Sequence, residues 1–267
     1  MPPIHRRAAV QAAAMALAAV AVPTLAAAAG PSSGKPPGRE ASGQKVLIVV
    51  SSHDRKGPDL VAGFWFPELT HPAQVFAEAG LAYDIASPRG GMPPFDGFDL
   101  RDEGNRWFWI QPEQRDKLAR SLPLAQVDAS QYAAVVLVGG HGPMWDFARN
   151  RELQAIVRSV YERGGVVGAV CHGPAGLLDL KLSDGRAFLA GRRLTAFTHA
   201  EEVSRQYDRL VPFVLESALK DDGAVFEHAG VFESRVVVDG RLVTGQNPAS
   251  ARPFGEAVAA LLARPAR

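Results

Sequence analysis

GVVGAVCHG, residues 165–173, joins a wholly apolar run to the only cysteine of the chain. A continuous apolar run of this length is typical of a strand buried on both faces of a parallel sheet. In Ala169-Val-Cys171-His-Gly173, small residues stand two positions either side of the cysteine, as a nucleophile on a sharp strand-to-helix turn requires. A lone cysteine is more often a buried structural residue, but this placement favours a working thiol.

The sequence on both sides of this stretch repeats the alternation of strand and helix. Apolar runs at 45–50 and 133–138 predict two further buried strands, and the second ends in a GGHG sequence. The remaining expected elements are a strand at 81–86, helices at 69–79, 151–163, 175–180 and 253–262, and a hairpin formed by 236–238 and 242–244. We therefore expect an α/β fold: a flavodoxin-like, doubly wound, mostly parallel sheet with helices on both faces. The N-terminus of the 175–180 helix would point at the Cys171 sulfur and favour its thiolate.

Three segments divide the chain. Residues 1–29 have a basic start, an apolar run and a small-residue end, which predicts a cleaved signal peptide, with a membrane anchor as the rival interpretation. Arg6-Arg7 is compatible with a twin-arginine signal, so we expect export to the periplasm, or a cytoplasmic protein if the start site is misassigned. Residues 30–44 predict a flexible linker, and residues 45–267 one domain in which about 92–130 form a small inserted cap.

The composition limits the classes of partner that we expect for this chain. The net charge is +1 from 29 basic and 28 acidic residues, which gives no overall basic field for nucleic acid. We expect no stable membrane association once the leader is cleaved. The histidines and the cysteine show no zinc-type spacing and no glycine-rich phosphate loop is present, so we expect neither a metal nor a cofactor.

Several collinear stretches of residues 45–262 resemble the ThiJ/PfpI superfamily, relatives of the class I glutamine amidotransferases. The resemblance rests on AVCHGPAGLL around Cys171 and on six further motifs: GFWFPELTHP, ASPRGGMPPFD, VGGHGPMWDF, LTAFTHAEE, VPFVLESAL and VVVDGRLVTGQNPAS. It is greatest to the branch of glutathione-independent glyoxalases and heat-shock-type chaperones. Relatives are commonly homodimers, so the resemblance also implies a homodimer.

Carried over residue by residue, the resemblance implies partners for Cys171. His172 matches the family histidine, Glu68 the glutamate that lies against the cysteine, and Glu202 the acid that orients the histidine, with Glu201 as the alternate. A Cys-His-acid arrangement supports nucleophilic catalysis. The backbone N–H groups of Gly140 and His172 would form an oxyanion site. The remaining candidates for the pocket are His141, Trp145 and Gly173.

The function expected from these residues is a cysteine-dependent glyoxalase III-type lyase. It would convert methylglyoxal or a similar α-oxoaldehyde into a hydroxy acid without glutathione. The alternative is a stress chaperone or thiol redox sensor, with exposed apolar surface around residues 107–110 and a readily oxidised thiol. Peptidase or amidase activity is a third possibility that the same triad allows.

Overall fold

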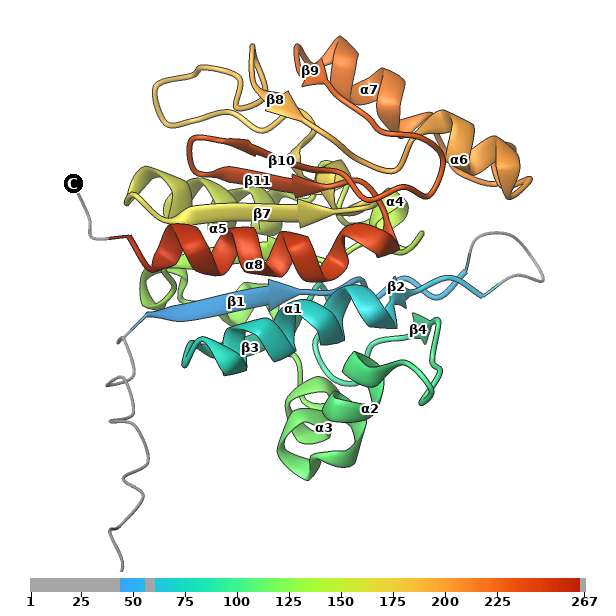
Figure 1. Cartoon of the computed structure of the whole chain (residues 1–267). Coiled ribbons are helices and arrows are strands. Elements are labelled where there is room, and N and C mark those ends of the chain that lie inside the picture. The colour runs from blue at the N-terminus through green and yellow to red at the C-terminus, as the bar shows by residue number, and fades with distance from the viewer. Residues whose placement is uncertain (1–43, 56–60, 265–267) are drawn as a thin grey trace, which may run out of the picture. The chain divides into compact units, whose positions relative to one another are not determined.

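A seven-stranded sheet forms the centre of the computed structural model, which describes residues 44–55 and 61–264 (Figure 1). The predicted leader and all of the predicted linker except Gln44 lie outside the described residues. In spatial order the strands are β10 (Val236–Asp239), β11 (Leu242–Gly245), β7 (Val166–Val170), β6 (Ala134–Leu137), β1 (Lys45–Val49), β3 (Ala82–Ser87) and β5 (Leu122–Pro123). Only β10 is antiparallel to its neighbour. The predicted parallel α/β sheet and its terminal hairpin are confirmed.

The central strands are apolar throughout because helices cover both of their faces. In β1, Val46 and Ile48 pack with α1 (Phe66–Glu78) and α8 (Ala251–Leu262), whereas Leu47 and Val49 pack with α5 (Arg151–Glu162) on the other face. Figure 1 shows α1 and α8 side by side in front of the sheet and α5 behind it. Successive side chains of a strand point to opposite faces, so a strand buried on both sides needs a continuous apolar run.

The short elements complete the described chain. The other α-helices are α2 (Glu103–Ile110), α3 (Pro112–Ala119), α4 (Pro143–Asp146), α6 (His199–Ser204) and α7 (Leu215–Asp221). The minor strands pair as β2 (Phe64–Trp65) with β4 (Phe95–Asp96) and as β8 (Arg193–Leu194) with β9 (Val225–Phe226). The 3₁₀ turns are η1 (Leu124–Gln126), η2 (Ala129–Gln131), η3 (Gly173–Leu177) and η4 (Pro248–Ser250).

The helix predicted at 175–180 is wrong. The chain forms the 3₁₀ turn η3 instead, Leu178 is already extended, and Asp179 has a left-handed backbone with φ 60°. The residues of the turn explain the difference: Gly173 and Gly176 flank Pro174, and glycine and proline are the residues that least favour a regular helix. A five-residue 3₁₀ turn carries little of the dipole of a regular helix, which removes the stabilisation expected for the Cys171 thiolate.

Residues 92–130, predicted as a cap, hold α2, α3 and the edge strand β5. Helix α2 packs on α1, where Phe108 meets Phe66 edge to face with ring centroids 5.7 Å apart. The Asp102 carboxylate accepts a hydrogen bond from the Asn105 N–H and so caps α2. Trp107 and Trp109 are half-buried against the core, whereas Ile110 is exposed. The segment therefore extends the β3 edge of the sheet and supports α1.

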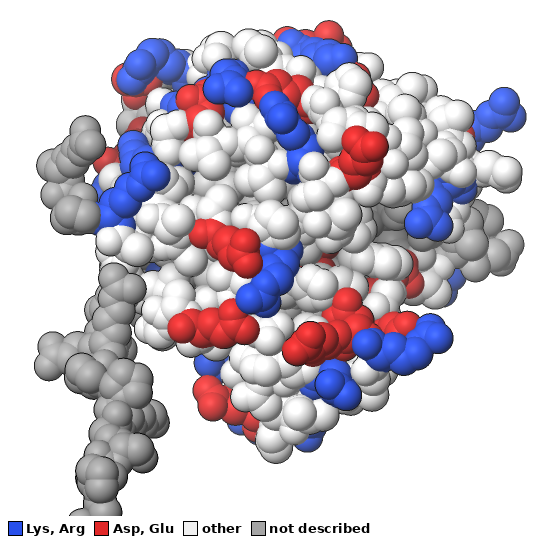
Figure 2. Space-filling view, in the orientation of Figure 1, with Lys and Arg blue, Asp and Glu red and all other residues white. Residues whose placement is uncertain are grey.

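On the face seen in Figure 2, lysine and arginine side chains lie among aspartates and glutamates. That face therefore presents no large field of one sign. Within the described ranges, no helix combines the length and the apolar character needed to cross a membrane.

Candidate active site

The loops that follow β6 and β7 meet at the carboxyl edge of the sheet. Strands β6 and β7 are neighbours, with Leu137 opposite Ala169, so Gly139 and Cys171 lie side by side just beyond them. A Cβ placed on Gly139 would lie 2.5 Å from the Cys171 Cβ and 2.6 Å from Oε2 of Glu68, near the start of α1. Only glycine fits there, and its absence of a side chain lets the three elements converge. The strand order reverses at β1, and ligands of open α/β sheets bind in such a crevice.

Cys171 occupies a strained turn that its neighbours hold in place. Its φ is 58°, in the left-handed region that costs a non-glycine residue about 1 kcal/mol or more. Its N–H donates to the Gly245 carbonyl over 2.9 Å, and its own carbonyl accepts from the Phe197 N–H over 2.9 Å. The thiol is 3% exposed. The predicted sharp turn is therefore present, and it is held by the end of β11 and by the loop after β8.

His172 connects the sulfur to a carboxylate. Its Nδ1 lies 3.2 Å from the Cys171 Sγ, and its Nε2 lies 2.5 Å from Oε1 of Glu202. The other carboxylate oxygen, Oε2, is 3.2 Å from Nε2 of His141. Burial alone would raise the pKa of Glu202, but hydrogen bonds and attraction from both histidines outweigh it and hold the pKa well below its usual range. An ionised carboxylate carries no proton, so both Nε2 atoms donate, and the Nδ1 of a neutral His172 faces the sulfur as an acceptor.

The adjacent Glu201 faces the other way and has a different set of partners. Its Oε2 accepts from the backbone N–H and hydroxyl of Thr198, while the Thr198 hydroxyl accepts from the Glu201 N–H, which makes a capping box at the start of α6. Its Oε1 accepts from Phe232 N–H, Gln246 Nε2 and Asn247 Nδ2. Of the two neighbouring acids, Glu202 contacts the histidines and Glu201 ties three loops together.

Glu68 is buried against the cysteine. Burial raises the pKa of Glu68 to about 8, with the Cys171 thiol and the Gly139 N–H lowering it in part and the Glu201 charge raising it. Neither of its oxygens makes a hydrogen bond of ordinary geometry with another described residue. Burial and then the Glu68 charge raise the pKa of the Cys171 thiol, whereas the Gly140 N–H lowers it. Two buried acids in contact cannot both ionise cheaply, so the pair carries at most one negative charge near neutral pH.

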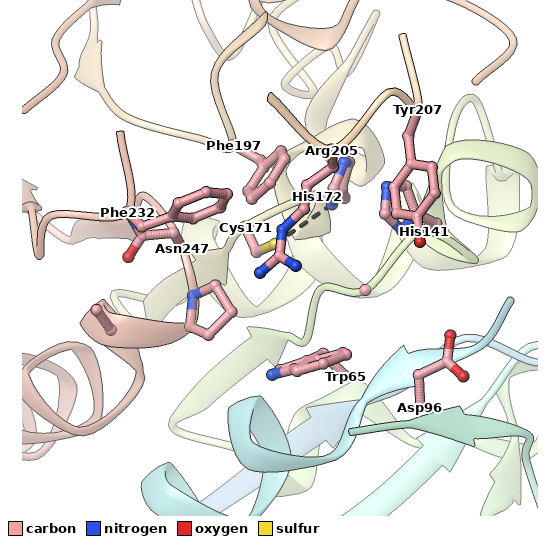
Figure 3. A pocket seen from close by; sticks show the side chains of 13 residues that line it. Trp65, Asp96, His141, Cys171, His172, Phe197, Arg205, Tyr207, Phe232 and Asn247 are labelled. Atoms are coloured by element: carbon pink, nitrogen blue, oxygen red, sulfur yellow. Dashed lines mark hydrogen bonds between the residues drawn. The ribbon is translucent and has the colours of Figure 1, made fainter. Parts of the chain in front are cut away.

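The sulfur opens into a mainly apolar pocket of about 360 Å³ (Figure 3). The lining residues are Trp65, Asp96, Gly140, His141, Cys171, His172, Phe197, Arg205, Tyr207, Phe232, Asn247, Pro248 and Ala249. Of the predicted pocket residues, Gly140 and His141 line it. Gly173 packs on the Leu137 backbone beside the pocket, and Trp145 stacks on His53 with ring centroids 4.8 Å apart, away from the lining. Sequence reasoning did not single out Arg205, Tyr207 or Phe232.

A metal could be held by His141, His172 and Glu202. One ligand atom from each lies within 4.8 Å of the others, and two imidazoles with one carboxylate form a donor set that suits zinc. In the arrangement described, both Nε2 atoms direct their protons at Glu202, so a cation would have to replace these protons.

The comparisons with known proteins agree with one another. The sequence profile of the DJ-1/PfpI family matches residues 61–261. The glutathione-independent glyoxalase hsp3101 of Schizosaccharomyces pombe is 31% identical over 246 residues, covering 81% of this chain and 95% of that protein. A 24 kDa rapid encystment protein of Francisella tularensis superposes with a TM-score of 0.80 and 34% identity, over 83% of this chain and all of that one. Glyoxalase III of Candida albicans gives 0.73 and 27%, over 82% and 97%.

Proposed function

Since this chain belongs to the DJ-1/PfpI family, we propose that it is a glutathione-independent glyoxalase acting on methylglyoxal or a similar α-oxoaldehyde. The observation that carries the proposal is the contact of one buried thiol with both His172 and Glu68 at the floor of an apolar pocket. Isomerising an α-oxoaldehyde needs a nucleophile for the aldehyde and a group that moves a proton between adjacent carbons. The relatives named as glyoxalases support the same activity.

The reaction begins with the thiol proton moving to Nδ1 of His172. The Cys171 thiolate then attacks the aldehyde carbon and forms a hemithioacetal, whose oxygen takes up a proton. Although burial raises the pKa of the Cys171 thiol, the proton transfer can accompany the attack, so no free thiolate has to accumulate. The Gly140 N–H faces the Cys171 sulfur and lowers the pKa of the thiol. It therefore stabilises the negative charge that develops on the sulfur during the proton transfer.

The second stage moves hydrogen from the aldehyde carbon to the neighbouring carbonyl carbon. Neutral His172, or Glu68 in the ionised fraction that its raised pKa leaves at neutral pH, removes the proton of the hemithioacetal carbon. The electron pair forms an enediol, and a proton is returned to the adjacent carbon. The product is the thioester of a hydroxy acid, and water cleaves its carbon–sulfur bond to release the acid and the thiol. The sum is R–CO–CHO + H₂O → R–CHOH–COOH, which needs no oxidant or cofactor.

Purified full-length protein with methylglyoxal and no glutathione tests the proposal. We expect the dicarbonyl to disappear and one equivalent of lactate to form. A coupled enzymatic assay for lactate measures this product. Hydrolysis of a fluorogenic peptide or amide serves as the comparison reaction. If dicarbonyl loss stayed at the buffer rate while the amide was cleaved, the glyoxalase assignment would be wrong and the hydrolase alternative would replace it.

The adjacent acids of α6 provide a matched pair of variants. We expect Glu202→Gln to lower kcat/KM about a hundredfold, because its amide can accept from only one of the two histidine N–H groups, those of His172 and His141, that Glu202 accepts. The loss of stability should be small, because the histidine that faces the new NH₂ group can change tautomer and accept from it. Glu201→Gln should instead lower the free energy of unfolding by about 2 kcal/mol, because a buried acceptor becomes mismatched with its donors. Steady-state kinetics and urea unfolding of both variants measure the contrast. The reverse pattern would assign the orienting role to Glu201.

A further inference from the structure

One charged side chain of the pocket has no part in the proposed chemistry. Arg205 follows Glu202 by three residues at the end of α6, so the two project from one face of that helix. Glu202 turns to the histidines, whereas Figure 3 shows the Arg205 guanidinium extending into the pocket in front of Cys171. Within residues 44–55 and 61–264, Arg205 forms no ion pair, and the carboxylate of Glu202 on the same helix face contacts His141 and His172 instead.

The Arg205 side chain is held in position by its contact with Phe232. Its guanidinium carbon lies 4.8 Å from the centroid of the Phe232 ring, a cation–π contact that leaves the N–H groups at the edge of the guanidinium available. Phe232 has a left-handed backbone with φ 59°, an outlier for a bulky residue. Its N–H donates to the buried Glu201 over 2.9 Å, and this bond fixes the strained residue. Helix α6 therefore positions both side chains: it carries Arg205 at its end, and its Glu201 holds the backbone of Phe232.

The other charges of the pocket leave room for an anion beside Arg205. Asp96 lies across the pocket from Arg205 in Figure 3 and already takes part in another interaction. Glu202 accepts two N–H groups, and burial keeps Glu68 largely protonated at neutral pH. Methylglyoxal fills on the order of 100 Å³, judged from about 30 Å³ for one water. The pocket of about 360 Å³ is considerably larger.

We propose that Arg205 selects α-oxoaldehydes that carry a carboxylate at the end remote from the aldehyde. The inference rests on the proposed glyoxalase function and deepens it by naming the substrate class. The aldehyde carbon meets the Cys171 sulfur while the guanidinium donates two N–H groups to the carboxylate, a charge-assisted and directional contact. The chemistry is unchanged: water is added, no redox equivalent is consumed, and the product is a 2-hydroxy dicarboxylic acid.

Two substrates that differ in charge and by one methyl group test the proposal: OHC–CO–CH₂–CH₂–COO⁻ and its methyl ester. For the wild type we expect kcat/KM on the acid to exceed that on the ester by about tenfold, the size of one partly exposed charge-assisted contact. Arg205→Met keeps most of the side-chain length without the charge and should bring the ratio to about one. Arg209→Met removes an exposed arginine outside the lining and should keep the wild-type ratio. A ratio equal in wild type and Arg205→Met overturns the proposal.

A binding measurement separates this inference from the reaction. In the Cys171→Ala background no covalent adduct forms, so calorimetry compares the affinities for the acid and the ester directly. We expect tighter binding of the acid by about tenfold, lost when Arg205→Met is added. Equal affinities for acid and ester would overturn the role of Arg205 even if methylglyoxal is turned over. Absence of turnover with preserved acid selectivity would instead refute the glyoxalase function and leave the anion site standing.

Discussion

Cys171→Ala is expected to lower kcat/KM for methylglyoxal by at least about a thousandfold, because the first covalent bond of the reaction is formed by this sulfur. The rate of Cys171→Ser should not exceed this residual rate by more than a few-fold, since a hydroxyl is a much poorer nucleophile than a thiolate. Loss of the buried sulfur costs about 1 kcal/mol of stability, so the variant should remain folded. The assay is lactate formation at several enzyme concentrations.

Circular dichroism and the thermal midpoint of Cys171→Ala serve as the control. The substitution keeps a Cβ at a left-handed position, so the strain at φ 58° is common to both proteins and cannot explain a difference in rate. Turnover within tenfold of the wild type by a folded variant would exclude the hemithioacetal route. In that case His172, His141 and Glu202 would have to act without a covalent intermediate.

The fold could be predicted from the sequence because the signal is local. A strand buried on both faces must be apolar at every position, and residues 46–50, 133–138 and 165–170 all meet that condition. The cysteine turn follows from the same reasoning, since small residues at 169 and 173 are needed where the backbone passes close. Gly173 illustrates the constraint: a Cβ there would lie 2.2 Å from the Leu137 carbonyl oxygen.

The choice between Glu201 and Glu202 was also within reach of the sequence. Thr198-His-Ala-Glu201 is a capping box, with a threonine at the N-cap and a glutamate three residues later. A glutamate engaged in that box points back at the helix start and cannot reach a histidine in another loop. Reading the box would have assigned Glu201 to structure and left Glu202 for His172.

Other features depend on tertiary structure and have no local signal. Arg205 and Phe232 meet because the loop after β9 returns over α6, and nothing in either segment alone predicts the contact. The raised pKa of the Cys171 thiol has no local signal either: the sequence places a turn after a strand, but only the packed structure reveals how completely the thiol is buried. Desolvation then outweighs what a short 3₁₀ turn can contribute.

Glu68→Gln should be increasingly more stable than the wild type as the pH rises, because the wild type must ionise a buried carboxyl and the variant need not. The pKa of Glu68 is raised to about 8 in the folded protein, chiefly by burial, from an ordinary value of 4.5. Between these values the folded state holds one proton more than the unfolded state, so wild-type stability falls as pH rises. Relative to wild type, the glutamine variant should gain about 3 kcal/mol between pH 5 and pH 8, measured by urea unfolding. Its amide is neutral throughout and has nearly the same shape.

Glu152→Gln, at the exposed start of α5, provides the matched control and should show no such trend. The trend should persist when Glu68→Gln is compared with wild-type Glu68 in the Cys171→Ala background, because burial is the first cause of the shift and the thiol only moderates it. A stability difference that stays constant from pH 5 to pH 8 would mean that Glu68 is ionised in the folded protein. Glu68 would then act from the start as a base beside the thiol, and His172 would have to supply the proton that the hemithioacetal oxygen takes up.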